Sequence, residues 1–220
     1  MKPLHVNSQI LYERCLREAT IKVAVDAGAN VGGYTNTLLE HGFSVHAFEP
    51  VPSVFKDLQL RFGSTPRVKL NQLGLSDSAY AMTDVTVLEA WTIGKPGDGG
   101  LQVKPEMKDS PVFDIHTISL DSYLGHKRIG IFKLDVDGME PRVLRGAAGT
   151  LIRDHPPILC EFSCYINKLG HSPEGFINLI LSLGYHIWSC DGENKFSSWQ
   201  EIAPHWPYHS SFDVMLLPFK

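Results

Sequence analysis

The chain has 220 residues, 43% of them hydrophobic, with a formal net charge of −4 and a pI near 6.2. This length and composition predict a single α/β domain over residues 1–220 with a sizeable core. The 20 Lys and Arg residues form no basic run, which argues against a nucleic acid partner. No apolar run approaches the roughly 18 residues of a membrane span. We therefore expect no membrane partner and a cytoplasmic location, and the sequence leaves the oligomeric state open.

Short β-type runs alternate with helical patterns in the first part of the chain. The predicted strands cover residues 21–28, 43–50 and 67–76, and the predicted helices cover residues 33–42 and 53–63. This alternation is typical of parallel strands that are linked by crossover helices.

A segment at about residues 81–124 interrupts this rhythm. Two β-type runs, "MTDVTVLEAW" and "FDIHTISL", flank "WTIGKPGDGGLQVKPEMKDSP", which is rich in Gly, Pro and charge. We predict a hairpin-like insertion with a mobile tip.

The alternation returns after the insertion and then ends differently. Strands are predicted over residues 129–136 and 156–162, and helices over residues 140–152 and 172–184. Ser172 is well placed to cap the second of these helices. The last two β-type runs, residues 185–190 and 212–218, have no helix between them. An antiparallel pair is therefore the simplest connection.

The four cysteines, Cys15, Cys160, Cys164 and Cys190, form no C-x-x-C pair. We favour buried, reduced thiols over a metal-binding or disulfide role.

Five predicted strands end in acidic residues or glycine. Asp26 and Gly28, then Glu49, then Ser76 and Asp77, then Asp135 and Asp137, and finally Glu161 follow one strand each. Ligands of an open α/β sheet bind beyond the carboxyl ends of its strands. A single Asp at a strand end is more often a helix cap or turn former, but five such ends on one edge indicate a binding site.

The glycine loop separates two classes of ligand. Dinucleotide-binding loops follow the pattern G-x-G-x-x-G, whereas the matching positions here are Gly28, Asn30 and Gly33. The side chain at the middle position argues against NAD. The loop instead reads D-x-G-x-N-x-G from Asp26, and Glu49 after the second strand is suited to accept the ribose hydroxyls of any adenosyl ligand.

The motif series resembles one known family. The stretches "VDAGANVGGYT", "HAFEPVP", "LGLSD", "TISLDSYL" and "FKLDVDGMEPRVLRGA", in this order and at these separations, are similar to those of the FkbM-type S-adenosylmethionine-dependent methyltransferases. The resemblance covers residues from about Val23 to Phe162. It implies a Rossmann-like class I methyltransferase sheet of seven mostly parallel strands, with the last strand antiparallel and helices on both faces.

The resemblance also assigns residues to the cofactor. It implies that Glu49 binds the ribose hydroxyls and that Asp135 lies near the donor methyl group. The other implied cofactor-binding residues are Asp26, Gly28, Asn30, Gly32, Tyr34, Thr35 and Pro50, with Leu75, Ser76 and Asp77 bordering the adenine. This chain has Asp137 and Met139 where the family more commonly has Glu and His.

Methyl transfer requires mainly that the nucleophile and the methyl group are aligned and that water is excluded. A hydroxyl acceptor must also lose its proton, and Asp135 and Glu161 are the candidate catalytic residues. We read Asp135 and Asp137 as lying on one face of a strand, with Glu140 and Glu161 close enough that the group could bind Mg²⁺. Neutralisation of these carboxylates by Lys133, Arg142 and Arg145 is the interpretation we prefer.

The resulting hypothesis is an S-adenosylmethionine-dependent methyltransferase that acts on a hydroxyl of a small molecule, natural product or sugar. A domain that binds an adenosyl ligand without turnover is the first alternative, and an NAD-linked oxidoreductase is a weaker one.

Overall fold

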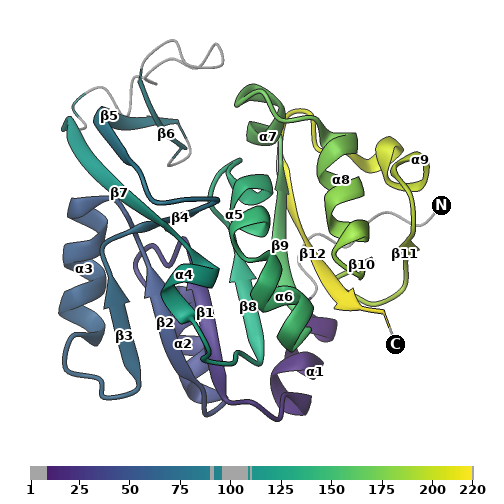
Figure 1. Cartoon of the computed structure of the whole chain (residues 1–220), viewed down its shortest axis with the longest axis horizontal. Helices are drawn as coiled ribbons and strands as arrows, with labels where there is room; N and C mark the ends of the chain where they lie inside the picture. The colour runs from purple at the N-terminus through teal and green to yellow at the C-terminus, as the bar shows by residue number, and fades with distance from the viewer. Residues whose placement is uncertain (1–8, 90–91, 96–108, 110, 220) are drawn as a thin grey trace.

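The computed structural model describes residues 9–89, 92–95, 109 and 111–219 (Figure 1). Its main sheet contains eight strands in the order β11-β10-β12-β9-β8-β1-β2-β3. These strands are β1 (Val23–Ala27), β2 (Ser44–Phe48), β3 (Val68–Asn71), β8 (Ile131–Leu134), β9 (Ile158–Ser163), β10 (Tyr185–Ser189), β11 (Lys195–Phe196) and β12 (Ser211–Pro218).

The direction of the strands confirms the prediction for both halves of the chain. The strands from β9 through β8, β1 and β2 to β3 pair parallel. The last strand, β12, lies between β9 and β10 and runs antiparallel to both. The predicted count of seven strands was one too low, because the two-residue strand β11 pairs with the edge of β10.

Helices cover both faces of the main sheet, as predicted. On one face lie α1 (Ile10–Glu18), α2 (Gly33–Glu40) and α3 (Pro52–Phe62). On the other lie α4 (Leu120–Leu124), α5 (Glu140–Gly146), α6 (Ala148–Asp154), α8 (Pro173–Ser182) and α9 (Trp199–Ile202). The helix predicted over residues 140–152 is thus two helices, since the chain bends at Ala147. None of the helices within the described ranges is long and apolar enough to span a bilayer.

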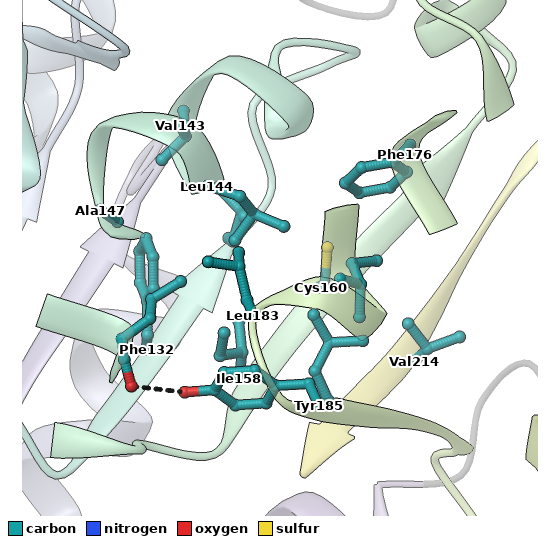
Figure 2. Packing of buried hydrophobic residues seen from close by; sticks show 14 of the residues in the cluster. Phe132, Val143, Leu144, Ala147, Ile158, Cys160, Phe176, Leu183, Tyr185 and Val214 are labelled. Atoms are coloured by element: carbon teal, nitrogen blue, oxygen red, sulfur yellow. Dashed lines mark hydrogen bonds between the residues drawn. The ribbon is translucent and has the colours of Figure 1, made fainter. Parts of the chain in front are cut away.

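The larger core lies between the sheet and the second group of helices (Figure 2). Phe132 and Ile158 on the strands pack with Leu144 on α5 and Phe176 on α8, and all four side chains are at least 98% buried. Tyr185 is 1% exposed, and its hydroxyl donates a hydrogen bond to the carbonyl oxygen of Pro156 at 3.1 Å. The Tyr185 hydroxyl is thus buried in the core together with a hydrogen-bond partner, as buried polar groups usually are.

A second sheet, which the sequence did not reveal as a sheet, lies over one end of the first (Figure 1). It has the order β4-β7-β5-β6 and consists of β4 (Gly74–Ser76), β5 (Ala81–Glu89), β6 (Thr92–Gly94) and β7 (Phe113–Ser119). β5 and β7 pair antiparallel, which is the pairing predicted for the two β-type runs of the insertion. The predicted mobile tip falls largely on residues 96–108, outside the described residues.

The single strand predicted over residues 67–76 was wrong, because the chain changes sheets within it. β3 pairs with β2 in the main sheet, whereas β4 pairs with β7 in the second sheet. The Asn71 side chain ends the first part by donating hydrogen bonds to the carbonyl oxygens of Ala47 and Lys69 at 3.0 and 3.1 Å. The transfer of the chain to β4 places the second sheet above the carboxyl ends of β1 and β2.

Features of the sequence that depend only on neighbouring residues, such as helix caps and helix ends, agree with the structure. The Ser172 hydroxyl accepts a hydrogen bond from the Gly175 amide at 3.1 Å and so caps α8. Gly42 follows α2 with a φ of 84°, a left-handed conformation that suits glycine. All four cysteines are free and buried, as predicted.

Candidate functional site

A cavity of about 620 Å³ opens at the carboxyl ends of the parallel strands. Its lining comes from the loops after β1, β2 and β8, from β4, β5, β6 and β7 of the second sheet, and from β9, β12 and α7 (Tyr165–Lys168). In Figure 1, β5, β6 and α7 all stand at this same end of the main sheet. Its volume lies within the usual range for a small-molecule site.

The glycine loop forms one wall, and its shape depends on missing side chains. Gly28 has a φ of +72°, and a Cβ atom there would lie 1.8 Å from the carbonyl oxygen of Asp135. Gly32 has a φ of +87°, and a Cβ atom there would lie 2.2 Å from the Phe62 ring. Asn30 also has a positive φ, and its Oδ1 accepts a hydrogen bond from the Val31 amide at 2.7 Å. The loop therefore presses against α3 and the end of β8, while Gly28 and Asn30 face the cavity.

Glu49, at the end of β2, lines the cavity and is held by the backbone. Its Oε2 accepts a hydrogen bond from the Asn30 amide at 3.0 Å, and its Oε1 accepts one from the Val51 amide at 2.9 Å. Burial raises the pKa of Glu49, although these two amides oppose the shift. Each carboxylate oxygen has a second lone pair, so both remain able to accept a hydrogen bond from a ligand hydroxyl.

Asp26 and Thr35 lie behind the cavity wall instead of in it. Asp26 is fully buried, and its Oδ2 accepts a hydrogen bond from the Thr35 hydroxyl at 2.6 Å. Its Oδ1 lies 3.6 Å from the Lys133 ammonium. Neither Asp26 nor Thr35 lines the cavity, and Gly32 does not either. These three predicted site residues thus support the loop from behind.

Lys133 ties the glycine loop to the end of β8. Its Nζ donates hydrogen bonds to the carbonyl oxygens of Gly28 at 2.7 Å and Ala27 at 3.3 Å, and lies 3.3 Å from Asp135 Oδ2. The side chain is 4% exposed. Burial alone would lower the pKa of Lys133, but the carboxylates of Asp135 and Asp26 outweigh it and raise that pKa. Lys133 is therefore a charged, fixed ammonium.

One row of charged side chains crosses four strands on one face of the sheet. Directly opposed residues share a face, and the register pairs Asp26 with Lys133 and Glu161 with Asp213. Asp135 and Glu161 come one residue after the last paired residues of β8 and β9. We call Asp26, Lys133, Asp135, Glu161 and Asp213 the polar row.

Crowding of carboxylates shifts the proton affinities in and around this row. Burial and the nearby Asp135 carboxylate raise the pKa of Glu161 to about 9, and a hydrogen bond with Ser211 only partly opposes this. The same two causes raise the pKa of Asp213 to about 6. Burial, Asp135 and Glu140 raise the pKa of Asp137 well above its usual value.

Tyr34 lines the cavity from α2 and is anchored at its hydroxyl. That hydroxyl donates a hydrogen bond to Asp213 Oδ2 at 3.3 Å and accepts one from Gln9 Nε2 at 3.0 Å. The Lys133 ammonium lies 5.2 Å from the centre of the ring. The first helix of the described chain is thereby connected to the site.

Of the predicted cofactor-binding residues in and near β4, some line the cavity and others lie outside it. Leu75 and Pro50 line the cavity, whereas Ser76 and Asp77 do not. Asp77 instead accepts two hydrogen bonds from Arg142, at 2.7 and 3.1 Å, and this partner lowers its pKa. Arg145 lies 3.9 Å from the same carboxylate.

The expected neutralisation of the central carboxylates was therefore right for Lys133 and wrong for both arginines. Asp135 and Asp137 are not on a strand, because β8 ends at Leu134 and Asp137 occupies a turn with a φ of 52°. Glu140 is fully buried and accepts hydrogen bonds from the Val136 and Gly138 amides at 2.9 and 3.0 Å. Within the described residues, no group of three or more His, Cys, Asp or Glu side chains is arranged to hold a metal ion.

Sequence reasoning missed several lining residues. Met82, Ile93 and Ile115 reach the cavity from the second sheet, while Tyr165 and Ser211 come from α7 and β12. Asp213 of the polar row was not predicted from the sequence either. A lone acid within the apolar run "FDVMLLP" is an unusual residue for a buried strand and could have indicated it. Lys133 stands out in the same way, as a basic residue within the apolar run "IGIFKLDV".

The cavity suits S-adenosylmethionine by shape and by charge. Gly28 and Asn30 bring the backbone of the loop to the cavity wall, and Glu49 offers two fixed acceptors. Among the described lining residues, Lys133 is the one Lys or Arg, against the four acids Glu49, Asp135, Asp137 and Glu161. Such an excess of acidic side chains favours a ligand that carries a positive charge, because that charge stabilises their ionised forms.

Solved structures place the fold in a known class. The chain superposes on a methyltransferase FkbM from Methylobacillus flagellatus KT with a TM-score of 0.54 and 17% identity, over 89% of this chain and 43% of that one. It superposes on the N-methyltransferase NodS from Bradyrhizobium japonicum WM9 with a TM-score of 0.50 and 9% identity, over 96% and 93% of the two chains. The fold is that of the Rossmann-like class I methyltransferases.

Sequence comparison narrows this class to a family. The family model described as "Methyltransferase FkbM domain" matches residues 26–187, and the chain belongs to this family of S-adenosylmethionine-dependent methyltransferases. "Methyltransferase 1" of Beauveria bassiana (strain ARSEF 2860) is 26% identical over 163 residues, which cover 64% of this chain and 66% of the relative. The chain thus spans slightly less than two thirds of this relative's length.

Proposed function

We propose that this protein methylates a hydroxyl group of a small molecule, natural product or sugar, with S-adenosylmethionine as the methyl donor. When bound, S-adenosylmethionine supplies an electrophilic methyl group on a sulfonium. Glu49 would accept hydrogen bonds from the ribose hydroxyls. Gly28, Asn30, Pro50 and Leu75 would form the rest of its binding surface, with Tyr34 closing one side.

The observation that carries the proposal is the position of Asp135 at the wall of the cavity. Asp135 follows β8 directly, its carbonyl oxygen packs against Gly28, and its carboxylate is held 3.3 Å from the Lys133 ammonium. A carboxylate fixed in this way can orient an acceptor hydroxyl and take its proton. An amine acceptor would need no such base once it is neutral, and this difference favours oxygen.

The charge of the cavity also bears on the acceptor. Four acidic lining residues against one basic residue disfavour an acceptor with a phosphate backbone. Apolar side chains from the second sheet, Met82, Ile93 and Ile115, would contact a less polar part of the ligands.

The substitution Asp135→Asn tests this function. It keeps the shape of the side chain but removes its charge and its basicity, so turnover should fall by roughly 10²–10⁴-fold. The affinity for S-adenosylmethionine, measured by calorimetry, should change far less. Methyl transfer to a panel of sugars and phenols, followed by mass spectrometry, provides the activity. Asp57→Asn, on the exposed side of α3, is the matched control.

Two results would argue against the proposal. Binding of NAD without binding of S-adenosylmethionine would favour the oxidoreductase alternative. Near wild-type turnover of Asp135→Asn on an authentic acceptor would remove Asp135 from the mechanism and leave Glu161 as the candidate base.

A further inference from the structure

Glu161 is an acidic lining residue whose charge the described residues around it compensate poorly. The Glu49 carboxylate receives two backbone amides, and Asp135 is paired with Lys133. Glu161 Oε2, by contrast, is buried and has no hydrogen-bond partner among the residues that the structure describes. Glu161 nevertheless lines the cavity, so a bound ligand would lie next to this carboxyl group.

The surroundings of Glu161 are dominated by other acids. The charged and titratable groups around it come from β8 and the loop after it, from α5, from α7 and from β12. They are Lys133, Asp135, Asp137, Glu140, Tyr165 and Asp213, with the Ser211 hydroxyl as an additional neighbour. Lys133 is committed to Asp135, Asp26 and two carbonyl oxygens.

A buried carboxyl group among carboxylates binds a proton unless a cation stabilises its charged form. Burial and the Asp135 carboxylate raise the pKa of Glu161 to about 9. Burial among these carboxylates therefore favours the protonated form of Glu161 in the free protein. A positive charge brought into the cavity would favour loss of that proton.

We propose that Glu161 exchanges its proton against the sulfonium charge: it releases a proton when S-adenosylmethionine binds and holds one when the demethylated product, S-adenosylhomocysteine, is bound. This inference rests on the proposed function, because it requires that the cavity binds S-adenosylmethionine. It assigns to Glu161 the final position of the acceptor's proton, which leaves Asp135 paired with Lys133 after the transfer.

The charges balance over the reaction. The C–S bond breaks with its electron pair left on sulfur, a lone pair of the acceptor oxygen forms the new O–C bond, and the O–H proton leaves. The sulfonium charge disappears in the same step in which this proton must be accepted. Asp135 receives the proton from the acceptor oxygen, and Glu161, its neighbour across the two strands, retains it. The net charge of the cavity with its ligands is then the same before and after transfer.

Calorimetric titration without any acceptor tests the proposal. S-adenosylmethionine and S-adenosylhomocysteine are each titrated into the protein in phosphate and in Tris, whose ionisation enthalpies differ, so that the difference in heat counts the protons released. Near neutral pH, wild-type protein should release about one proton more for S-adenosylmethionine than Glu161→Gln does. For S-adenosylhomocysteine, the two proteins should differ little.

The comparison with Glu161→Gln is made with the same ligand, so protons that come from the ligand's own α-amino group cancel. Glutamine has nearly the same shape as glutamate, and retained binding of S-adenosylhomocysteine shows that the variant is folded. Glu174→Gln, exposed in the first turn of α8, should release as many protons as the wild type.

Other outcomes overturn the proposal in distinguishable ways. Equal proton release by the wild type and Glu161→Gln refutes the role of Glu161. Release that is lost in Asp137→Asn but kept in Glu161→Gln assigns the exchange to Asp137 instead. If the wild type binds neither ligand, the proposed function itself fails, and the inference fails with it.

Discussion

At the scale of single residues, the cavity depends on where side chains are absent as much as on where they are present. Gly28 adopts a left-handed conformation and lies directly against the Asp135 backbone. Gly33, five residues later, starts α2, and a Cβ atom there would have no atom of the described chain within 4 Å. The two glycines of one loop thus have opposite tolerance for substitution.

This contrast gives a prediction for a matched pair of variants. Gly28→Ala should destabilise the fold by at least the roughly 1–2 kcal/mol cost of a left-handed alanine, and should abolish cofactor binding because the loop must move. Gly33→Ala should raise the free energy of unfolding by roughly 0.5–1 kcal/mol, since alanine favours the helix. Urea unfolding of both variants measures the two effects, and equal stability of the pair would contradict the structure.

Glu49 provides the second prediction at this scale. Glu49→Ala removes the proposed acceptors of the ribose hydroxyls and also the partner of the Asn30 and Val51 amides. The affinity for S-adenosylmethionine should fall by about 2–4 kcal/mol, the order expected for hydrogen bonds to a charged group. Calorimetric titration gives the dissociation constant, with the exposed Glu174→Ala as the control. An unchanged constant would mean that the ribose is held elsewhere.

The sequence pattern predicted at which end of the sheet the acidic residues gather, but not which of their side chains face the cavity. The acids in or just after the last residues of β1, β2, β8 and β9 do gather at one end of the sheet, because parallel strands bring their carboxyl ends together. The sequence could not tell that Asp26 supports the loop from behind, since that depends on which face of β1 packs against Thr35 and Lys133.

At the scale of elements, helices and strands that depend on local signals were predicted well, and those that depend on distant partners were not. The Ser172 cap follows from residues close in sequence. The antiparallel pairing of the final strands was predicted from the lack of a helix between them, and the pairing is confirmed, although the four-residue α9 does lie between β10 and β12. The split between β3 and β4 follows from pairing of β4 with β7, more than 40 residues away. No local pattern in the sequence indicates such a partner. The pairing of β4 with β7 also fixes the positions of Ser76 and Asp77, which do not line the cavity.

The cap of α8 can be tested directly. Ser172→Ala removes the acceptor of the Gly175 amide and should lower the free energy of unfolding by about 1 kcal/mol. Ser182→Ala, at the other end of the same helix, removes an exposed hydrogen bond to the Leu179 carbonyl oxygen and should change it by less than about 0.5 kcal/mol. Thermal unfolding of both variants gives the comparison, and equal losses would show that the cap contributes nothing specific.

At the scale of the whole molecule, two sheets meet at the cavity and enclose more acids than bases. The main sheet supplies the polar row, and the second sheet supplies apolar side chains. Carboxyl groups that are buried in this way bind protons more tightly in the folded chain than in the unfolded chain. The pKa values rise from 4.5 to about 9 for Glu161, from 4.5 to about 7 for Glu140 and from 3.8 to about 6 for Asp213.

These shifts predict how the stability of the free protein depends on pH. A carboxyl group with a raised pKa in the folded state contributes stability that is complete below its unfolded pKa and is lost as the pH rises through its folded pKa. The free energy of unfolding should therefore decrease continuously between about pH 5 and about pH 9. Glu161 contributes to this decrease over the whole range, and Asp213 and Glu140 add to it below about pH 7. Melting temperatures measured by circular dichroism across this range test the slope. Glu161→Gln should make the decrease shallower throughout this range, with the largest relative effect above about pH 7, where Asp213 and Glu140 no longer contribute. A melting temperature that stays constant or rises toward alkaline pH would contradict the burial of these acids in the folded chain.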